Sequence, residues 1–356
     1  MSKDINTLSS KAIDLLKELI ATPSFSKEEN ETAEIICNFF ASLDVEFARV
    51  GNNVYAKSKY YDVSKPSVLL NSHHDTVKPN AKYTKDPFEP IAEDGKLFGL
   101  GSNDAGGCLV SLMAVFLYYY DRKDLNHNVV FAASAEEEIS GVNGIELVLP
   151  YLGNIDFGIV GEPTKMEMAV AERGLMVIDC IAQGKAGHAA RNEGENALYI
   201  ALDDINWIRH CKFDKVSPLL GESKMTVTVI GTDNQQHNVV PPQCKFVIDV
   251  RVNELYTFEE MLSLLKANIK SQFKPRTTRM KPTSISLEHP LVKAGIDLKR
   301  GYYGSPTTSD KALMPFPALK MGPGDSARSH TADEYIYIDE IKNGIDLYIQ
   351  LLNRVI

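Results

Sequence analysis

Short apolar runs that lack polar alternation constrain this chain more than any other feature of its sequence. Each run is bounded by turn residues, which is typical of strands buried on both faces of a mixed or parallel sheet. The runs are VLLNS at 68–72, VVFAAS at 129–134, DFGIV at 156–160 and ALKMG at 318–322. Helical periodicity predicts helices that could cover such a sheet at residues 9–20, 27–43, 105–121, 289–300 and 339–354.

A different pattern occupies residues 169–283. Its apolar segments alternate with polar residues, which indicates a sheet with one solvated or helix-covered face. The segments are GLMVIDCIAQG, KMTVTVIG and KFVIDVRV, with helical stretches near 195–210 and 257–270 between them. We therefore predict an α/β fold in which a mixed sheet flanked by helices, built from residues 1–168 and 284–356, is interrupted by a ferredoxin-like α+β insert at 169–283.

The composition limits the class of protein. A formal net charge of −9 leaves no basic stripe to neutralise phosphates, which argues against a nucleic-acid surface. The first residues, MSKDINTLSS, lack the apolar core of a signal peptide, and the longest apolar stretch, 108–120, is too short to span a bilayer. Five widely spaced cysteines without a Cys-x-x-Cys pair suggest neither a disulfide framework nor a thiolate zinc site, so we expect reduced thiols in a cytoplasmic protein.

Acidic and histidine residues stand where the apolar runs end. His73 and Asp75 follow the first run, and the three glutamates 136–138 follow the second. The others are Glu162 after DFGIV, Asp325 and His330 after ALKMG, and Asp104 in the glycine-rich turn GLGSNDAGG. Ligands of open α/β sheets bind beyond the carboxyl ends of the strands, so five segments could deliver these groups to one edge of one sheet.

Each of these residues has an ordinary alternative role. An acidic run such as SAEEEISG is usually a solvated edge, a lone histidine is usually a hydrogen-bonded surface or core residue, and an aspartate in a glycine-rich turn usually serves the turn. However, these ordinary roles would have to apply independently to the acidic or histidine residues of all five segments, which makes a common site the simpler explanation. Two imidazoles with several carboxylates are the ligand set of a zinc or cobalt site without cysteine, and the sequence predicts such a site.

The spacing of these residues also suggests roles. His73 and Asp75 point the same way along an extended strand, so Asp75 can accept the proton on the far nitrogen of His73. Of the neighbours Glu137 and Glu138, one could bind metal while the other faces the bound water as a general base. The segment GLGSND begins like a dinucleotide-binding loop, but Asp104 replaces the third glycine and would repel a pyrophosphate, so nucleotide binding is rejected.

Nine motifs, taken in order, carry a resemblance that covers nearly the whole chain. They are HHDTV, GLGSNDAGG, AEEEISG, GEPT, GHAA, NVVPP, DVR, TSD and GPGDSARSHTADE. With them the chain resembles the di-zinc amidohydrolase and exopeptidase family that contains acetylornithine deacetylase and succinyl-diaminopimelate desuccinylase, and acetylornithine deacetylase is the branch it resembles most.

The resemblance implies a site with two Zn²⁺ ions, for which Co²⁺ could substitute. It assigns His73 and Glu162 to one metal, Glu138 and His330 to the other, and Asp104 to both as a bridge. It further implies that Glu137 is the general base and proton shuttle, and that Asp75 is the partner that orients His73.

The resemblance also assigns the insert as a dimerisation or lid domain, so we expect a homodimer formed through residues 169–283. His188, in GKAGHAA, would reach the active site of the partner subunit and stabilise the oxyanion, although a capped turn is its ordinary alternative. Asn238 and Arg251 would hold the α-carboxylate of the substrate, with Arg173 a weaker candidate for the same task. Thr308 and Ser309 would line the substrate pocket.

Three residues depart from the family's motifs. Lys78 follows HHDTV where the family usually has proline, so this loop could be displaced, and Glu136 replaces a commoner aspartate. Lys311 follows TSD where small residues are frequent. It could bind an extra acidic group such as a succinyl tail, or it could be a solvated surface lysine.

The leading hypothesis is a metal-dependent enzyme that hydrolyses the amide bond of a small N-acyl amino acid. N-acetylornithine or an N-acylcitrulline, in arginine biosynthesis, is the favoured substrate, and a carboxylate and the free amino acid are the products. The alternatives are a succinyl-diaminopimelate desuccinylase or a dipeptidase of the same family. A metal-binding homologue without activity is the non-enzymatic alternative, against which the intact base, ligands and bridge argue. The sequence leaves the acyl group and the amino acid open.

Overall fold

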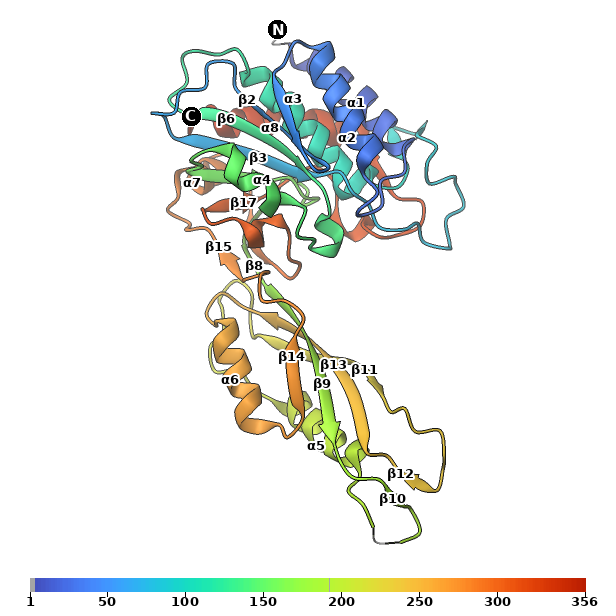
Figure 1. Ribbon diagram of the computed structural model, residues 1–356. Coiled ribbons are helices and arrows are strands. Elements are labelled where there is room, and N and C mark those ends of the chain that lie inside the picture. Colours follow the sequence, from blue (N-terminus) through green and yellow to red (C-terminus); the bar gives the residue numbers. More distant parts are fainter. Residues whose placement is uncertain (1–3, 192) are drawn as a thin grey trace. The chain divides into compact units, whose positions relative to one another are not determined.

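The protein folds into two compact units. The structure is a computed structural model, and it describes residues 4–191 and 193–356. The first unit comprises Met1–Val170, Ile285–Tyr303 and Ser309–Ile356, and the second comprises Ala171–Ser284 and Gly304–Thr308 (Figure 1). Each unit has its own sheet and its own hydrophobic core.

A mixed sheet forms the centre of the first unit. Its strands lie in the order β1 (Phe47–Val50), β2 (Asn53–Lys57), β6 (Asn128–Ser134), β3 (Ser67–His73), β7 (Phe157–Val160), β17 (Ala318–Lys320) and β8 (Met168–Glu172). The strands β6, β3, β7 and β17 run parallel, whereas β2 pairs with β6 in the antiparallel sense. Every residue of β3 and β6 is buried, as their unbroken apolar sequences predict.

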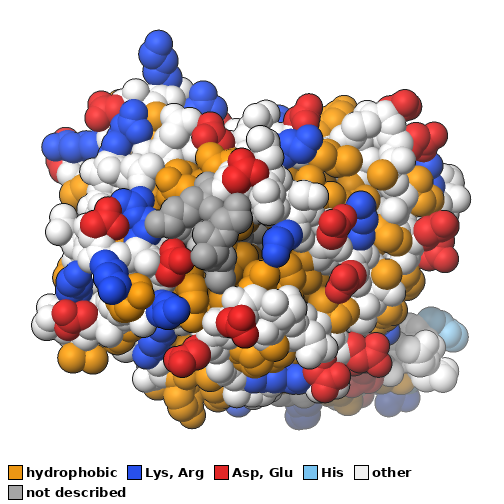
Figure 2. Space-filling view, turned by 90° about the horizontal axis from the view of Figure 1, so that it is seen from above, with side chains coloured by type: hydrophobic (Ala, Val, Ile, Leu, Met, Phe, Trp, Pro, Cys, Tyr) orange, Lys and Arg blue, Asp and Glu red, His pale blue; other side chains and the backbone are white. Residues whose placement is uncertain are grey.

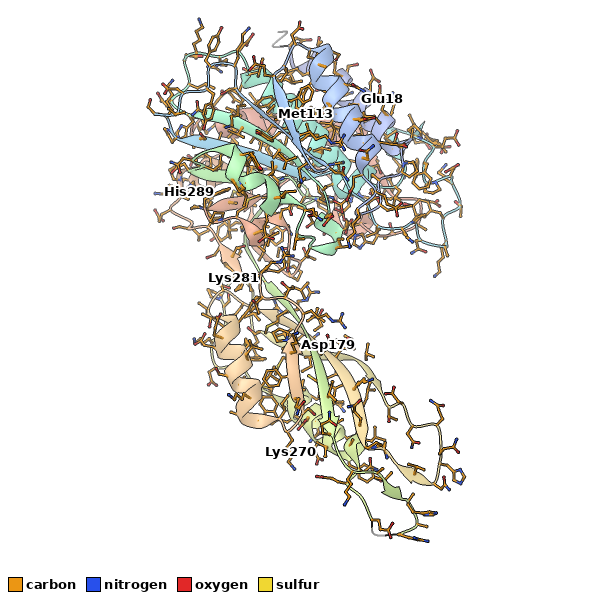
Figure 3. The ribbon with its side chains drawn as sticks, in the orientation of Figure 1. Glu18, Met113, Asp179, Lys270, Lys281 and His289 are labelled. Carbon is orange, nitrogen blue, oxygen red and sulfur yellow. The ribbon has the colours of Figure 1, made fainter. Side chains whose placement is uncertain are left out.

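Helices cover both faces of this sheet (Figure 1). One face carries α1 (Ile5–Ile20), α2 (Asn30–Ser42), α3 (Gly107–Tyr119) and α8 (Ile338–Leu352). The helix α3 is apolar on all sides and almost completely buried; its Met113, labelled in Figure 3, is 1% exposed. On the other face, Ile145 and Val148 of α4 (Ile145–Leu152) pack on Leu69 of β3 and Val130 of β6. The predicted α/β sheet with helices on both faces is confirmed.

The second unit has the predicted ferredoxin-like arrangement. Its elements follow the order β9 (Gly174–Gln183), α5 (Ala197–His210), β11 (Lys224–Gly231), β13 (Gln243–Val252), α6 (Phe258–Asn268) and β14 (Gln272–Pro275). The strands form an antiparallel sheet in the order β11-β13-β9-β14, and alternate residues of β9 and β13 are buried. Asp179 of β9 (Figure 3) lies on the other side of the strand, where it pairs with Arg276.

Several short elements complete the fold. They are β4 (Ile91–Glu93), β5 (Lys96–Phe98), β10 (Gly187–His188), β12 (Val239–Val240), β15 (Thr283–Ser284), β16 (Tyr302–Ser305), β18 (Tyr335–Tyr337), α7 (Pro290–Asp297) and the turns η1 (Ser102–Gly106), η2 (Glu137–Ile139), η3 (Asp310–Leu313) and η4 (Ser326–Arg328). Two predicted helix starts were wrong. The helix expected from residue 9 begins at Ile5, where the Asp4 side chain caps it. The helix expected from residue 27 begins at Asn30, because the chain turns at Lys27, whose φ is 78°.

Charges of both signs are mixed on one face of the protein. On the face that Figure 2 shows, Lys and Arg side chains are interspersed with Asp and Glu. Among the helices that the structure describes, no apolar helix reaches the length needed to cross a membrane.

Candidate metal centre and active site

Five segments of the first unit converge at the carboxyl ends of its parallel strands. His73 is the last residue of β3, and η2, which carries Glu137 and Glu138, follows β6. Glu162 comes two residues after β7. Because β3 is parallel to both β6 and β7, all three strands end at one edge of the sheet, and the residues that follow them meet there. Asp104 in η1 and His330 after η4 complete the group.

The side chains of these residues approach one another closely. The Nε2 atom of His73 lies 3.5 Å from Oδ1 of Asp104, 3.8 Å from Oε1 of Glu162 and 3.9 Å from Oε2 of Glu137. The Nε2 atom of His330 lies 3.1 Å from Oε2 of Glu138 and 3.6 Å from Oδ2 of Asp104. The two oxygens of Asp104 therefore face two different histidines.

The ring of His73 is oriented with Nε2 toward the carboxylates. Its Nδ1 donates to the backbone carbonyl of Asp75 at 3.0 Å, and the nearer carboxylate oxygen of Asp75 is 3.4 Å away. A proton on Nδ1 leaves Nε2 with a lone pair, as a metal ligand requires. This Nε2 is buried without a hydrogen-bond partner among the described residues, which is costly for a polar atom unless a ligand such as a metal ion engages it.

The carboxylates outnumber the cationic groups, and the pKa values reflect this excess. Burial raises the pKa of Glu137 well above its ordinary value, and neighbouring carboxylates raise it further. Burial also raises the pKa of Glu138. The hydrogen bond from His330 to Glu138 raises the pKa of the imidazole to about 9. The buried carboxylates repel one another, and binding a proton reduces this repulsion. A divalent cation among them would reduce it in the same way.

Two sets of these residues could each hold an ion. Within each set the ligand atoms lie within 4.8 Å of one another; the sets are His73, Asp104 and Glu138, and His73, Glu137 and Glu162. Imidazole nitrogens and carboxylate oxygens suit Zn²⁺ and Co²⁺. Both sets share Nε2 of His73, which can bind only one ion, so a second ion would use His330, 3.1 Å from Glu138 and 3.6 Å from Asp104. With His330 the residues present fit a two-metal site, and Glu137 lies within the same reach as the ligands.

The residues expected to bind substrate lie mostly in the second unit. His188 and Asn238 are exposed neighbours at the small antiparallel sheet of β10 and β12, where the amide of Ala189 donates to the Asn238 carbonyl. Arg251 on β13 forms a two-point ion pair with Asp249, at 2.8 and 3.1 Å.

The other residues expected to bind substrate are divided between the two units. Arg173 donates to the carbonyl of Leu220 and its own carbonyl accepts from the hydroxyl of Thr308 at 2.8 Å, all within the second unit. Ser309 belongs to the first unit, where it is buried at the start of η3.

The surface alternative for Lys311 was wrong. This side chain is 2% exposed, and its Nζ lies 3.4 Å from the carbonyl oxygens of Ala169 and Val170. The alternative that Lys311 binds an acidic group of the substrate stays a prediction. Lys78 is exposed. Glu136 is buried and accepts from the backbone and side-chain nitrogens of Asn143.

Sequence reasoning missed three buried carboxylates beside the site. Glu334, 2% exposed, accepts the backbone N–H groups of Asn103 and Asp104 at 2.9 and 3.0 Å, and burial raises its pKa to about 8. Asp310 accepts from the Ser134 hydroxyl at 2.5 Å. These two end the motifs HTADE and TSD, which could have drawn attention to them. Glu29 lies in the polar stretch SKEENE, which carries no signal of burial.

Comparison with known proteins identifies the family. Residues 69–354 match the peptidase family M20/M25/M40. The chain belongs to this family. Its members are metal-dependent hydrolases of amide bonds, and the His, Asp and Glu groups described above agree with a dinuclear metal site of M20 type.

Relatives of this M20 chain share its full length at low identity. It is 25% identical over 372 residues to a succinyl-diaminopimelate desuccinylase of Rickettsia bellii, with 95% of each chain covered. It is 26% identical over 353 residues to a [LysW]-lysine/[LysW]-ornithine hydrolase of Sulfurisphaera tokodaii, covering 96% of this chain and 95% of the relative. The desuccinylase relative favours the desuccinylase alternative over the acetylornithine deacetylase hypothesis.

A solved structure confirms the M20 fold. The aminopeptidase PepT of Bacillus cereus superposes with a TM-score of 0.79 at 18% identity, covering 98% of both chains. At this identity the likeness establishes the fold alone.

Proposed function

We propose that this M20 hydrolase is a di-zinc enzyme that cleaves the amide bond of a small N-acyl amino acid, with an N-succinyl amino acid of the diaminopimelate type as its substrate. The position of Asp104, with one oxygen 3.5 Å from His73 and the other 3.6 Å from His330, carries the two-metal part of this proposal. Several relatives are named succinyl-diaminopimelate desuccinylases, and this supports the choice of succinyl as the acyl group. The products would be succinate and the free amino acid.

The residues of the first unit would divide the work. His73 and Glu162 would hold one metal, Glu138 and His330 the other, and Asp104 both. When bound, the two ions would polarise the amide carbonyl and lower the pKa of a water molecule. Glu137 would accept a proton from the attacking water and donate it to the departing amide nitrogen. Asp75 would keep the ring of His73 in place.

The residues of the second unit would recognise the substrate. Asn238 and Arg251 would bind its α-carboxylate, since an arginine has five donors and Asp249 occupies two of those on Arg251. Arg173 would be a weaker candidate for the same contact, and Thr308 and Ser309 would line the pocket. His188 would stabilise the oxyanion.

A homodimer through the second unit is part of the same proposal. The strand β11 stands at the edge of its sheet, and its Val229 and Ile230 are 58% and 46% exposed. The helix α5 exposes Tyr199 and Leu202. An unpaired edge strand with apolar side chains is a surface that a second copy could cover.

We expect the protein to bind about two Zn²⁺ per chain, because one carboxylate faces two separate pairs of ligands. Metal analysis after exhaustive dialysis and reloading would measure the stoichiometry. Since an ion that binds only the folded state stabilises it by mass action, reloading should also raise Tm. A reloaded protein without a bound divalent ion would contradict the two-metal proposal.

A substrate panel tests the reaction. We expect N-succinyl-diaminopimelate to be hydrolysed with a kcat/KM at least about tenfold above that of N-acetylornithine or N-acetylcitrulline, equivalent to about 1.4 kcal/mol of transition-state binding. Succinylornithine and simple dipeptides complete the panel and separate the acyl group from the amino acid. A preference for an acetyl compound or a dipeptide would overturn the substrate assignment, and no hydrolysis of any amide would overturn the function.

A further inference from the structure

The segment that carries Glu137 and Glu138 is held by side chains along its backbone. Four consecutive amides, from residue 135 to residue 138, donate to side-chain oxygens from other parts of the first unit. Ala135 donates to Asn53 at 3.0 Å and Glu136 to Glu29 at 3.1 Å. The amides of Glu137 and Glu138 donate to the two oxygens of Asp75, at 3.0 and 3.2 Å.

This support matters because the chain turns sharply at this point. Glu136 has a left-handed backbone with φ 53°, which is unfavourable for a residue with a side chain. The turn η2 starts directly after it and directs Glu137 toward His73 and Glu138 toward His330. The amide of Glu136 thus sits where the directions of the two functional carboxylates are set.

Glu29 is built into the fold as an acceptor. Its side chain is fully buried, and its carboxylate receives three neutral donors. Oε1 accepts from the amides of Lys27 at 2.6 Å and Glu136 at 3.1 Å, and Oε2 accepts from the side chain of Asn52 at 2.8 Å. A buried carboxylate is retained only where hydrogen bonds compensate its desolvation, and here one of the three comes from the catalytic segment.

A second contact ties the region around Glu29 to the site. The hydroxyl of Thr32 bonds both the Glu29 carbonyl and Nδ1 of His74, and Nε2 of His74 lies 2.9 Å from the carbonyl of Asn52. His74 is the residue after the ligand His73. The region around Glu29 is therefore linked by hydrogen bonds to the end of β3.

We propose that Glu29 is a positioning residue, whose buried carboxylate fixes the amide of Glu136 and thereby the separate directions of Glu137 and Glu138. This inference rests on the roles given to those two glutamates under the proposed function. Glu29 lies outside residues 69–354, the part of the chain that matches the family.

Glu29→Gln tests the proposal at constant shape. The substitution replaces one acceptor oxygen by an NH₂ group. If this group faces the two backbone amides, donor meets donor; if it faces Asn52, the Asn52 amide must turn to accept from it and give up its bond from Arg49. We expect kcat to fall about tenfold with KM changed less than about twofold, and the affinity for the second Co²⁺ to fall about tenfold, since misdirected supports of metal ligands have effects of this size. Glu28→Gln, the same change at the exposed neighbour, is the matched control and should match the wild type.

The readouts separate positioning from stability and from the proposed reaction. Kinetics measured well below Tm, per folded molecule, together with a Co²⁺ titration of the metal-free protein, decide the matter. A variant with lower Tm but wild-type kcat and Co²⁺ affinity would overturn the proposal. If the wild type hydrolyses no amide but Glu29→Gln still weakens Co²⁺ binding, the positioning role stands and the proposed function fails.

Asn52→Ala provides a second variant in case Glu29→Gln does not fold. It removes one donor to the Glu29 carboxylate at a half-buried turn and leaves the carboxylate charged. We expect losses of kcat and Co²⁺ affinity in the same direction, of about threefold, because the carboxylate is less firmly held. Unchanged values for both would overturn the proposal.

Discussion

Glu137→Gln is expected to lower kcat by about three orders of magnitude while the protein keeps its full complement of metal. An amide cannot accept the proton of the attacking water, and general acid–base catalysis contributes about 10²–10⁴-fold. Burial and the neighbouring carboxylates raise the pKa of Glu137, so its affinity for a proton suits a group that accepts one and releases it again. Steady-state kinetics with parallel metal analysis measures both quantities.

Glu138→Gln is the matched control one residue away. Because Glu138 contacts His330 rather than His73, we expect this variant to bind one metal more weakly and to recover part of its activity at high Zn²⁺. Activity of Glu137→Gln should not respond to added metal. If Glu137→Gln kept a near-normal kcat, Glu137 would not be the base. If the variant lost metal as Glu138→Gln does, Glu137 would be a ligand instead.

The fold and the sheet edge that carries the candidate metal ligands followed from local patterns. Strands buried on both faces need unbroken apolar runs, so β3 and β6 could be located within one or two residues from their sequences. Parallel strands end at one edge of a sheet, so the sequence alone could predict that His73, Glu138 and Glu162 lie near one another. Alternation in β9 and β13 likewise predicted the ferredoxin-like unit.

Buried charges could not be predicted in this way, because their acceptors and donors are distant in sequence. Glu29 is 107 residues from Glu136, and nothing in a polar stretch announces that its carboxylate meets a backbone amide there. Lys311 is buried, with the carbonyl oxygens of Ala169 and Val170 3.4 Å from its amine. A charged side chain is exposed unless tertiary structure supplies partners, so sequence alone favours the surface for both.

The roles expected for Asp75 illustrate the same limit. The prediction assumed that the strand extends to Asp75 and that its carboxylate accepts from Nδ1 of His73. The strand β3 ends at His73, and Nδ1 donates to the backbone carbonyl of Asp75 at 3.0 Å, with the carboxylate 3.4 Å away. Its carboxylate holds the amides of Glu137 and Glu138 and the hydroxyl of Ser26. Alternation along a strand fixes direction but carries no information on which loop arrives opposite.

His188→Ala is expected to lower kcat by about 10²–10³-fold, the usual cost of losing one oxyanion donor. The local geometry supports a donor role: the amide of Ala190 donates to Nδ1 of His188 at 3.1 Å, so the proton of the neutral ring resides on Nε2. The side chain is exposed, and this Nε2–H is available to a carbonyl oxygen. Metal content should not change, because His188 belongs to the second unit and all proposed ligands belong to the first.

Mixing His188→Ala chains with Glu137→Gln chains distinguishes action across a dimer from action within one chain. If His188 acts on the partner subunit, each mixed dimer combines one site that has both groups with one that lacks both. Random exchange at equal concentrations makes half the dimers mixed, so activity should recover to about a quarter of the wild-type value from two nearly inactive parents. If His188 acts within its own chain, every site in every dimer lacks one group and the mixture stays inactive. A mixture that remains inactive after subunit exchange has been verified would therefore refute the action of His188 across the dimer.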